Sequence, residues 1–267
     1  MPQTDPTSTR SAQIQRAQTH RERAILERLG LTGSARIPDL ATALGVTEET
    51  IRRNVRRLEA AGTVTKTHGG VHLKDWGQEP TFALRYVQNA TAKRAIAARV
   101  AGLIKDGASV FLDVGSTTAY VAQALRQHRD LQIVTNSLSV ATALAGVNGN
   151  RLFMAGGELR RHDGGAFGAE ALAFVRQFRL SQAVMSATAI DAKGGFLLQD
   201  LPEAEFGRAV LAQAAEVMVA ADASKFSRTA PIRLAPPQAI NRLVTDAPPP
   251  APIATMLTEA GVTVTLA

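Results

Sequence analysis

The stretch Thr47-Glu-Glu-Thr-Ile-Arg-Arg-Asn-Val-Arg-Arg-Leu-Glu-Ala-Ala-Gly62 has the pattern of a single amphipathic helix with a marked beginning and end. Thr47 can cap the helix, because its hydroxyl can accept a hydrogen bond from an unpaired backbone N–H. Glu48 and Glu49 place negative charge in the first turn, where the helix dipole favours it. Gly62 can end the helix in a left-handed conformation.

The two faces of this predicted helix differ in chemistry. One face carries Ile51, Val55 and Leu58 at spacings of four and three, which makes an apolar stripe. A helix with an apolar back and an Arg-rich front fits the major groove of DNA, where Arg binds guanine edges and phosphates. The residues of this segment that we expect to contact DNA are Thr47, Glu48, Thr50, Arg52, Arg53 and Arg56.

The neighbouring segments complete a DNA-binding domain. Residues 37–44 place their apolar side chains on one helical face, and Gly45-Val46 follows as a tight turn, which is the helix-turn-helix pattern. Residues 64–73 form two β-prone halves around a Gly-Gly pair, which predicts a hairpin. A hairpin at this place is the wing of a winged helix-turn-helix, and we expect Lys66 and His68 near the phosphate backbone. A small helical domain with a solvated basic face is the alternative, but it does not explain this order of elements.

Composition supports a polyanionic partner for this part of the chain. The 267 residues suffice for one small and one medium domain, and the net charge is +7. Residues 1–75 hold twelve Lys and Arg against eight Asp and Glu, so they carry +4 of that charge.

Several classes of protein are disfavoured by the same composition. The absence of cysteine excludes disulfides and thiolate metal sites and fits a cytoplasmic location, which we expect. The five histidines show no ligand spacing, so we expect no metal site and no cofactor. No apolar run is long enough to span a bilayer, and no signal-peptide core follows Met1, so we expect no membrane partner.

We predict four segments along the chain. Residues 1–13 form a flexible tail, 14–74 the winged helix-turn-helix domain, 75–90 a linker, and 91–267 an α/β domain for effector binding and oligomerisation. Within the first domain we expect a helix over residues 14–29 and a loop over residues 30–36.

The C-terminal part alternates strands with helices, which predicts a doubly wound, mostly parallel α/β sheet. The expected strands are 109–112, 131–137, 151–157, 183–185, 217–222 and 243–246, with 262–266 as a further edge.

Ligands of such sheets bind beyond the carboxyl ends of the strands, and polar residues gather there in this sequence. Gly115 lets the backbone approach a ligand closely, and the N–H groups and hydroxyls that follow it can donate to a phosphate at a helix N-terminus. Lys225 adds positive charge, and Asp113 and Asn136 can hold sugar hydroxyls. The candidate ligand-binding residues are Asp113, Gly115, Ser116, Thr117, Thr118, Thr135, Asn136, Ser137, Gly156, Gly157 and Lys225.

Each of these groups also has a plain structural interpretation. A Gly-Ser-Thr-Thr turn after a strand often only caps a helix, a single Lys is usually solvated, and an Asp at a strand end often caps a loop. Four such groups at successive strand ends nevertheless favour an anion-binding site.

The sequence resembles the DeoR-type bacterial transcription regulators over roughly residues 16–246. The resemblance lies in Thr50–Gly62 with His68-Gly-Gly70 and in the strand-end motifs 113–118, 135–137, 156–157 and 221–226. It implies an effector domain with a ribose-phosphate-isomerase-like fold that senses phosphorylated sugars or their metabolites. It also implies that Gly168 lies near the ligand and that Glu203 and Glu205 belong to the segment covering it.

The sequence departs from the family pattern at three places. Asn54 stands where the family usually has Asp, which keeps the size and removes the charge. Residues 186–189 (Ser-Ala-Thr-Ala) replace a Gly-Ala-x-Gly pattern, and we expect the extra methyl of Ala189 to narrow the space there. Gly207 stands where a Lys is frequent, and loss of that cation changes which anion fits.

The leading hypothesis is a sequence-specific transcriptional regulator, a repressor of a carbohydrate catabolism operon. It would bind double-stranded operator DNA as a homo-oligomer, a dimer or tetramer, under control of a phosphorylated sugar or related metabolite. One alternative is a sugar-phosphate isomerase fused to a DNA-binding module, but no second acidic residue is clearly placed beside Asp113, so we predict no catalytic residues and no enzyme. The other is a basic protein that binds nucleic acid without sequence preference.

Overall fold

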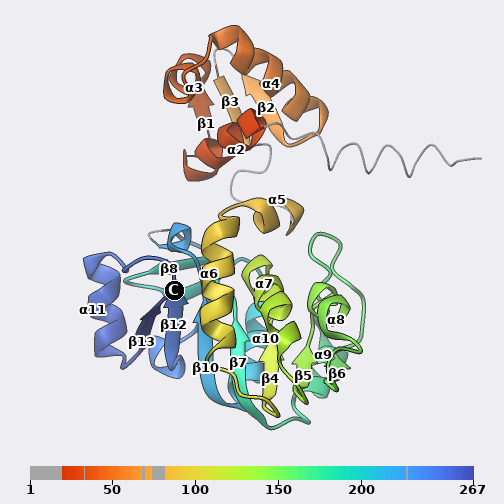
Figure 1. Cartoon of the computed structure of the whole chain (residues 1–267). Coiled ribbons are helices and arrows are strands. Elements are labelled where there is room, and N and C mark those ends of the chain that lie inside the picture. Colours follow the sequence, from red (N-terminus) through yellow and green to blue (C-terminus); the bar gives the residue numbers. More distant parts are fainter. Residues whose placement is uncertain (1–19, 33, 68–69, 74–81, 227) are drawn as a thin grey trace, which may run out of the picture. The chain divides into compact units, whose positions relative to one another are not determined.

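The chain folds into two compact units, Met1–Gln78 and Glu79–Ala267, in the computed structural model (Figure 1). The structure describes residues 20–32, 34–67, 70–73, 82–226 and 228–267. The predicted tail, His68 and the predicted linker up to residue 81 therefore lie outside the described residues.

The first unit is a winged helix-turn-helix, as the sequence predicts. In its described residues, a three-stranded antiparallel sheet in the order β1-β3-β2 joins three helices. Its elements are α2 (His20–Thr32), β1 (Ser34–Arg36), α3 (Ile37–Leu44), α4 (Glu48–Ala60), β2 (Val64–Thr67) and β3 (Gly70–Leu73).

The ends of α4 follow the sequence signals. Thr47 is extended and its Oγ1 accepts a hydrogen bond from the backbone N–H of Thr50 at 3.3 Å. Gly62 has a φ of +73°, and the N–H of Thr63 returns to the carbonyl of Leu58 at 2.9 Å. The apolar stripe of the helix, including Leu58, is buried.

The predicted loop over residues 30–36 is wrong. Helix α2 continues to Thr32, and Ser34–Arg36 form β1, which pairs with β3. Strand β1 depends on a partner more than thirty residues away, so local sequence preferences do not reveal it.

The second unit contains a seven-stranded sheet, parallel throughout, in the order β13-β12-β10-β7-β4-β5-β6. Its strands are β4 (Ser109–Leu112), β5 (Gln132–Thr135), β6 (Arg151–Met154), β7 (Leu180–Met185), β10 (Ala214–Ala220), β12 (Arg242–Thr245) and β13 (Thr263–Leu266). Its helices are α5 (Phe82–Val87), α6 (Ala90–Ala101), α7 (Ser116–Ala124), α8 (Leu138–Leu144), α9 (Ala169–Val175), α10 (Leu201–Leu211) and α11 (Ala251–Glu259).

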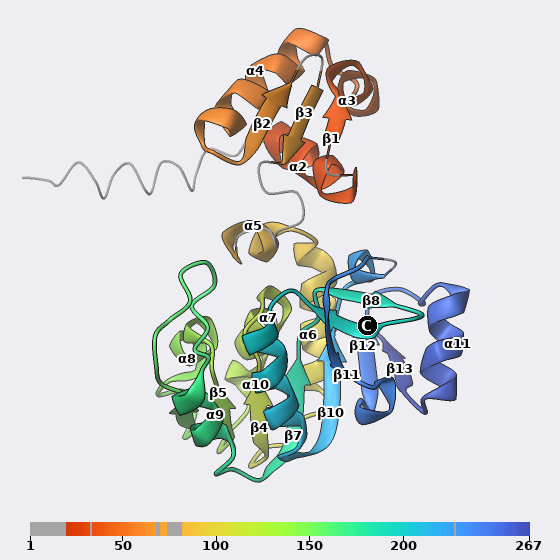
Figure 2. The ribbon, with the colours of Figure 1, turned by 180° about the vertical axis from the view of Figure 1, so that it is seen from behind.

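Helices cover both faces of this sheet, which confirms the doubly wound prediction. Val110 and Leu112 of β4 pack in a core with α6, α7 and α8. Phe111 between them faces the other way, into a core with α9, α10 and α11. Figure 1 shows α6 and α7 before the sheet, and Figure 2 shows α10 before the opposite face.

A small antiparallel sheet was not predicted. It has the order β11-β9-β8, with β8 (Ala189–Asp191), β9 (Gly195–Leu198) and β11 (Ile232–Ala235). Strands β8 and β9 form a hairpin whose turn is residues 192–194, and β11 comes from the segment between β10 and β12.

The order of the large sheet creates a switch point between β4 and β7. From β4 the chain proceeds to β5 and β6 on one side, and from β7 to β10, β12 and β13 on the other. The two loops that leave β4 and β7 therefore diverge, and a crevice at this place is the usual ligand site of doubly wound sheets.

Gly207→Ala is expected to destabilise the second unit. Gly207 is buried on α10, and an added Cβ would lie 2.6 Å from Cδ1 of the fully buried Leu234 and 3.4 Å from Cε of Met185. We expect a loss of about 1–3 kcal/mol from overpacking, measured by urea denaturation. Gly102→Ala is the control, because its Cβ would have only ordinary contacts at 3.6 Å on an exposed helix end. Equal denaturation midpoints for the two variants would contradict the packing argument.

Candidate functional site

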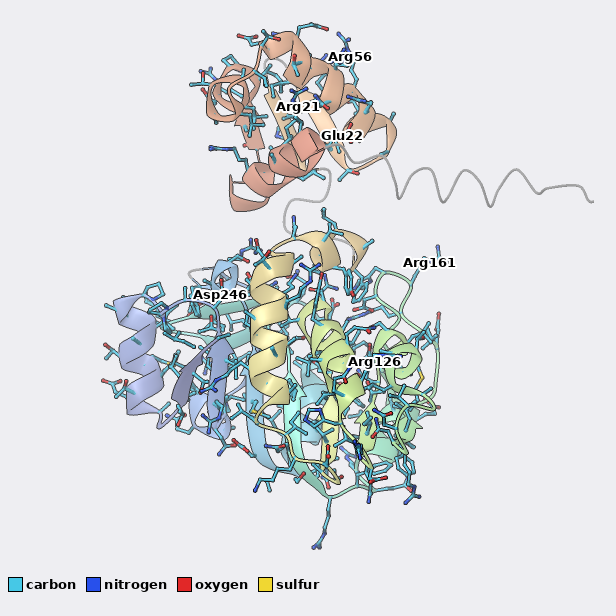
Figure 3. The ribbon with its side chains drawn as sticks, in the orientation of Figure 1. Arg21, Glu22, Arg56, Arg126, Arg161 and Asp246 are labelled. Atoms are coloured by element: carbon cyan, nitrogen blue, oxygen red, sulfur yellow. The ribbon has the colours of Figure 1, made fainter. Side chains whose placement is uncertain are left out.

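The arginines of α4 divide into two sets. Arg52 contacts Glu48 at 2.8 Å, Arg56 contacts Glu49 at 3.6 Å, and Arg53 is exposed. Both pairs are exposed on the surface of the helix, so a phosphate can displace them at little cost. Figure 3 shows Arg56 at the outer surface of the unit. Of the remaining predicted DNA contacts, the cap residue Thr47, Glu48 and Lys66 of β2 are exposed, and Thr50 is half-buried.

Arg57 has a structural role instead. Its Nε lies 3.1 Å from Oε1 of the buried Glu22 on α2, and its Nη2 donates to Oδ1 of Asn54 at 3.0 Å. Asn54 is buried and donates to the carbonyl of Thr50 at 2.7 Å. The Asn that replaces the usual Asp thus keeps a hydrogen bond to a neighbouring arginine, as a neutral acceptor.

Asp113 lies at the switch point, directly after β4. It is 3% exposed, and its Oδ2 accepts hydrogen bonds from the N–H of Ser186 at 3.1 Å and from its hydroxyl at 2.9 Å. Ser186 directly follows β7, so this pair ties together the ends of the two diverging strands. A Cβ on Gly115 would lie 2.9 Å from Cβ of Ser186, so glycine is needed for this close approach.

Burial raises the pKa of Asp113 to about 6, although the hydrogen bonds from Ser186 and the charge of Arg160 oppose the shift. The fold therefore keeps a carboxylate where ionisation is unfavourable, which is a feature of functional sites.

Helix α7 begins just beyond this carboxylate, and Ser116, Thr117 and Thr118 are all buried. The first N–H groups of an α-helix have no partner within the helix, so this end can bind an anion. The hydroxyl of Thr118 donates to the carbonyl of Gly115 at 3.0 Å. This bond engages Thr118 with the backbone but does not cap the helix, because no side chain caps α7.

The residues at the end of β5 have unequal roles. Thr135 donates to the carbonyl of Leu112 at 2.6 Å, and Ser137 caps α8 by accepting from the N–H of Val140 at 3.4 Å. Asn136 is fully buried and donates to the carbonyl of Ala166 at 3.3 Å. Its Oδ1 has no hydrogen-bond partner among the described residues, so Asn136 presents a buried acceptor without a donor.

The β6–α9 loop (residues 155–168) was not expected to hold a charge network, yet Arg160 lies at the centre of one. It donates to Asp163 from Nε at 3.0 Å and from Nη2 at 2.5 Å, to Asp200 at 2.8 Å, and to Glu203 at 3.2 Å. Its guanidinium also lies 4.3 Å from the ring centre of Phe167. An Arg and an Asp three residues apart in a Gly-rich loop were the available sequence signal.

Asp163 remains ionised within this network. Burial opposes its ionisation, but hydrogen bonds and charge from Arg160 outweigh that effect and hold its pKa below the usual value. Glu203 is buried beside Arg160, whereas Glu205 is exposed on α10. The structure therefore brings only the first of the two predicted glutamates into the network.

The three predicted glycines of the β6–α9 loop are exposed. Gly156 and Gly157 follow β6 and are exposed, and Gly157 has a φ of +120° with Phe167 close by. Gly168 has a φ of +99° and precedes α9. We use the name strand-end cluster for the residues brought together here: Asp113, Asn136, Arg160, Asp163, Ser186 and Glu203.

A second group of charges lies after β10. Oδ1 of Asp222 accepts hydrogen bonds from Nδ2 of Asn89 at 2.9 Å and from the N–H of Ser224 at 3.1 Å, and its Oδ2 has no hydrogen-bond partner in the described ranges. Lys225 is half-buried next to it. Burial opposes ionisation of Asp222, but these hydrogen bonds and the nearby lysines hold its pKa below the usual value.

Lys93 of α6 was missed by the sequence analysis. It is 3% exposed, and its Nζ donates to the carbonyl of Gln88 at 2.9 Å and to that of Arg85. Burial lowers the pKa of Lys93 to about 8, against the attraction of Asp222. The spacing of Lys93 with Ile96, Ala97 and Val100 was the available signal, because it places Lys93 on the buried face of α6.

Two departures from the family pattern also have structural roles. Ser186 supplies both hydrogen bonds to Asp113, and Gly207 packs against Leu234 so closely that a lysine there would force that contact to change.

Two negative findings apply to the described part of the chain. Within it, no group of three or more His, Asp or Glu side chains is arranged to hold a metal ion. No helix in those ranges is long and apolar enough to cross a membrane.

Comparison with known proteins identifies the class. Residues 21–75 match the DeoR-like helix-turn-helix domain, and residues 88–247 match the DeoR C terminal sensor domain. The chain therefore belongs to the DeoR family of transcriptional regulators.

Individual relatives agree over most of the length. The chain is 35% identical over 242 residues to the glycerol-3-phosphate regulon repressor of Escherichia coli (strain K12), covering 91% of this chain and 96% of that protein. It is 34% identical over 234 residues to the HTH-type transcriptional repressor CsqR of the same organism, covering 88% and 90%. The structure of ribose 5-phosphate isomerase A from Methanocaldococcus jannaschii matches with 18% identity and a TM-score of 0.39, covering 52% of this chain and 55% of that one. The named relatives are repressors, so the regulator hypothesis is confirmed over the isomerase alternative.

Asp113→Asn is expected to stabilise the protein at neutral pH. The unfolded carboxyl ionises near pH 3.8 and the folded one near pH 6, so wild-type stability from this group falls as the pH rises through that interval. Asparagine has no ionisable carboxyl, so the variant avoids this loss. For a pKa shift of about two units, the gain in the free energy of unfolding is at most about 3 kcal/mol. Urea denaturation at pH 4.5, 6 and 8 should show the advantage growing up to pH 6 and then holding constant.

Asp222→Asn is the control with opposite sign. Its carboxylate has a lowered pKa, so its ionised form stabilises the fold above the unfolded value, and neutralising it should destabilise the protein at pH 6 and 8. If Asp113→Asn were less stable than wild type at pH 8, the ionised carboxylate would not be destabilising, and the prediction would be wrong.

Proposed function

We propose that the chain represses a carbohydrate catabolism operon and releases its operator when a small phosphorylated polyol or sugar binds at the strand ends. The observation that carries this proposal is the buried, ionisable Asp113 at the switch point, beside a helix N-terminus. One end of such a site favours an anion and the other accepts hydroxyl donors. The name of the glycerol-3-phosphate regulon repressor supports a phosphorylated polyol as the ligand class.

For the phosphate end we assign the first turn of α7. Gly115 allows close approach, and the N–H groups and hydroxyls of Ser116 and Thr117 can donate to phosphate oxygens. Lys225 adds a positive charge. This region already holds positive charge, because Lys225, Arg85 and Arg228 lie near enough to Lys93 to lower its pKa.

For the polyol end we assign the strand-end cluster. Asp113 and Glu203 are carboxylate acceptors, and Asn136 has a buried oxygen that still needs a donor. Hydroxyl groups supply donors of this kind, and a buried acceptor gains most from them. Contacts from Gly156, Gly157, Gly168 and Glu205 stay predictions.

For the operator we assign the exposed face of α4 together with the wing. Arg53 and Arg56 are exposed and would reach base edges or phosphates, joined by Thr47, Glu48, Thr50 and Arg52 and by Lys66 on the wing. One such helix contacts too few base pairs for useful specificity, so we propose a homo-oligomer, a dimer or tetramer, on a repeated site in the cytoplasm. The ligand can release DNA only to the extent that it binds the DNA-incompetent state more tightly.

Arg53→Ala and Arg56→Ala are each expected to weaken operator binding by about 1–3 kcal/mol, roughly 5- to 150-fold, because each removes a contact to a base edge or phosphate. Fluorescence anisotropy with operator and random DNA measures this. Arg176→Ala is the charge-matched control, because Arg176 is exposed in the second unit. Unchanged operator affinity in both α4 variants would remove α4 as the DNA-contacting helix, and equal affinity for random DNA would favour the non-specific alternative.

Glycerol 3-phosphate and a panel of sugar phosphates are expected to raise the melting temperature, and glycerol and free sugars are not. Binding at a hundredfold excess over Kd stabilises a protein by about 2.7 kcal/mol. Lys225→Ala should weaken the response by about tenfold or more, since a bond to a charged group contributes roughly 1.5–3 kcal/mol. Lys105→Ala, at an exposed lysine of the same unit, is the control. A panel with no response would contradict phosphate sensing, and an unaltered response in Lys225→Ala would remove Lys225 from the site.

A further inference from the structure

Helix α5 (Phe82–Val87) is the first described element that follows the DNA-binding unit in the chain. We propose that α5 couples the effector site to that unit, and that Arg85, Tyr120 and Asp163 carry the coupling. This inference rests on the proposed function, because it concerns how occupancy of the effector site is transmitted.

Helix α5 is too short to be stable alone. Six residues give fewer than two turns, whereas isolated helices shorter than about a dozen residues are marginal in water. Its position is therefore set by the groups that hold it. These groups come from the β6–α9 loop, from α7 and from α6, and the first two of these segments contribute to the candidate effector site.

The β6–α9 loop holds the first turn. The N–H of Phe82 donates to the carbonyl of His162 at 3.3 Å, and Nη2 of the buried Arg85 lies 3.9 Å from Oδ2 of Asp163. Asp163 is also the carboxylate that binds Arg160 through both of its oxygens. Asp163 therefore contacts both Arg160 of the strand-end cluster and Arg85 of α5.

Helix α7 holds the last turn. The hydroxyl of Tyr120 donates to the carbonyl of Tyr86 at 3.1 Å, and the two rings stack with centres 4.6 Å apart. Tyr120 lies one helical turn after Ser116, at the end of α7 that we assign to the phosphate. A shift of that end on ligand binding moves the donor of this hydrogen bond.

Helix α6 caps the C-terminal end of α5. The buried ammonium of Lys93 donates hydrogen bonds to the carbonyls of Arg85 and Gln88. A cation is favourable at this place because the C-terminal end of a helix carries partial negative charge. The adjacent Asn89 donates to Asp222 at 2.9 Å, so the region after β10 is joined to the same point.

These contacts transmit movement because most of them bind the backbone of α5. The N–H of Phe82 and the carbonyls of Arg85, Tyr86 and Gln88 are all engaged by other segments. A ligand that takes a donor of Arg160 weakens the hold of Arg160 on Asp163, and Asp163 then turns toward Arg85. The new balance moves α5 as a unit rather than one side chain, and α5 is the first described element after the DNA-binding unit in the chain.

The test compares Tyr120→Phe and Arg85→Met with wild type and with the control Arg126→Met. Tyr120→Phe removes one hydroxyl and keeps the ring stack, so it preserves the fold. Arg126 also donates to a backbone carbonyl, that of Ala143 at 2.7 Å, but it follows the opposite end of α7 (Figure 3). For each protein, anisotropy gives the operator Kd with and without saturating glycerol 3-phosphate, and calorimetry gives the glycerol 3-phosphate Kd.

The decisive readout is the ratio of the two operator Kd values. We expect wild type and Arg126→Met to share one ratio, within the roughly 5- to 150-fold range of allosteric coupling. Tyr120→Phe and Arg85→Met should lower it at least fivefold or bring it to one, with the ligand-free operator Kd changed less than twofold. Coupling is reciprocal, so glycerol 3-phosphate should then bind the free and the operator-bound variants almost equally.

The failures are distinguishable. Wild-type protein that does not bind glycerol 3-phosphate, or binds it without releasing the operator, overturns the proposed function and the coupling with it. A wild-type ratio retained by Tyr120→Phe overturns the coupling alone, whether or not Arg85→Met folds. An equal loss in Arg126→Met overturns it as well, because the loss would then not be specific to α5.

Discussion

The hydrogen bonds from Ser186 to Asp113 hold together the point on which the second unit depends. They join the ends of β4 and β7, the two central strands after which the chain diverges toward opposite edges of the sheet. They also partly satisfy a buried carboxylate whose ionisation the surroundings disfavour. Because Ser186 approaches so closely, position 115 has to be glycine, and that glycine sets where α7 begins.

Sequence patterns predicted the elements whose signals are local. Helix α4 was fixed by Thr47 and Gly62 at its ends and by an apolar stripe, all of which act within a few residues. The strands of the parallel sheet were predicted because both faces are buried, as the opposite packing of Phe111 and Leu112 illustrates. Asp113 and Asn136 were found because residues at the ends of such strands meet at one edge.

Long-range interactions escaped the sequence analysis. Strands β1 and β11 pair with partners far along the chain, and no local pattern marks them. The β8–β9 hairpin is local, and its Gly194-Gly195 pair was a signal that the sequence analysis did not use. Arg160 and Asp163 lie in a loop without periodicity, so only the folded chain brings them to Glu203. Lys93 was visible as a cation on an apolar stripe, but its acceptors come from the end of another helix, which spacing cannot predict.

The balance of donors and acceptors restricts what the strand ends can hold. Asn136 and Asp222 each keep a buried oxygen without a hydrogen-bond partner in the described ranges, and Asp113 adds a carboxylate that is costly to ionise. A ligand composed only of anionic groups would leave these acceptors unsatisfied and would repel the carboxylates. A ligand with hydroxyl groups would supply the missing donors, and in the proposed site its phosphate would take the N–H groups of α7 and the charge of Lys225. The phosphorylated polyol or sugar that we propose has both kinds of group, an anionic end and hydroxyl groups at the other end.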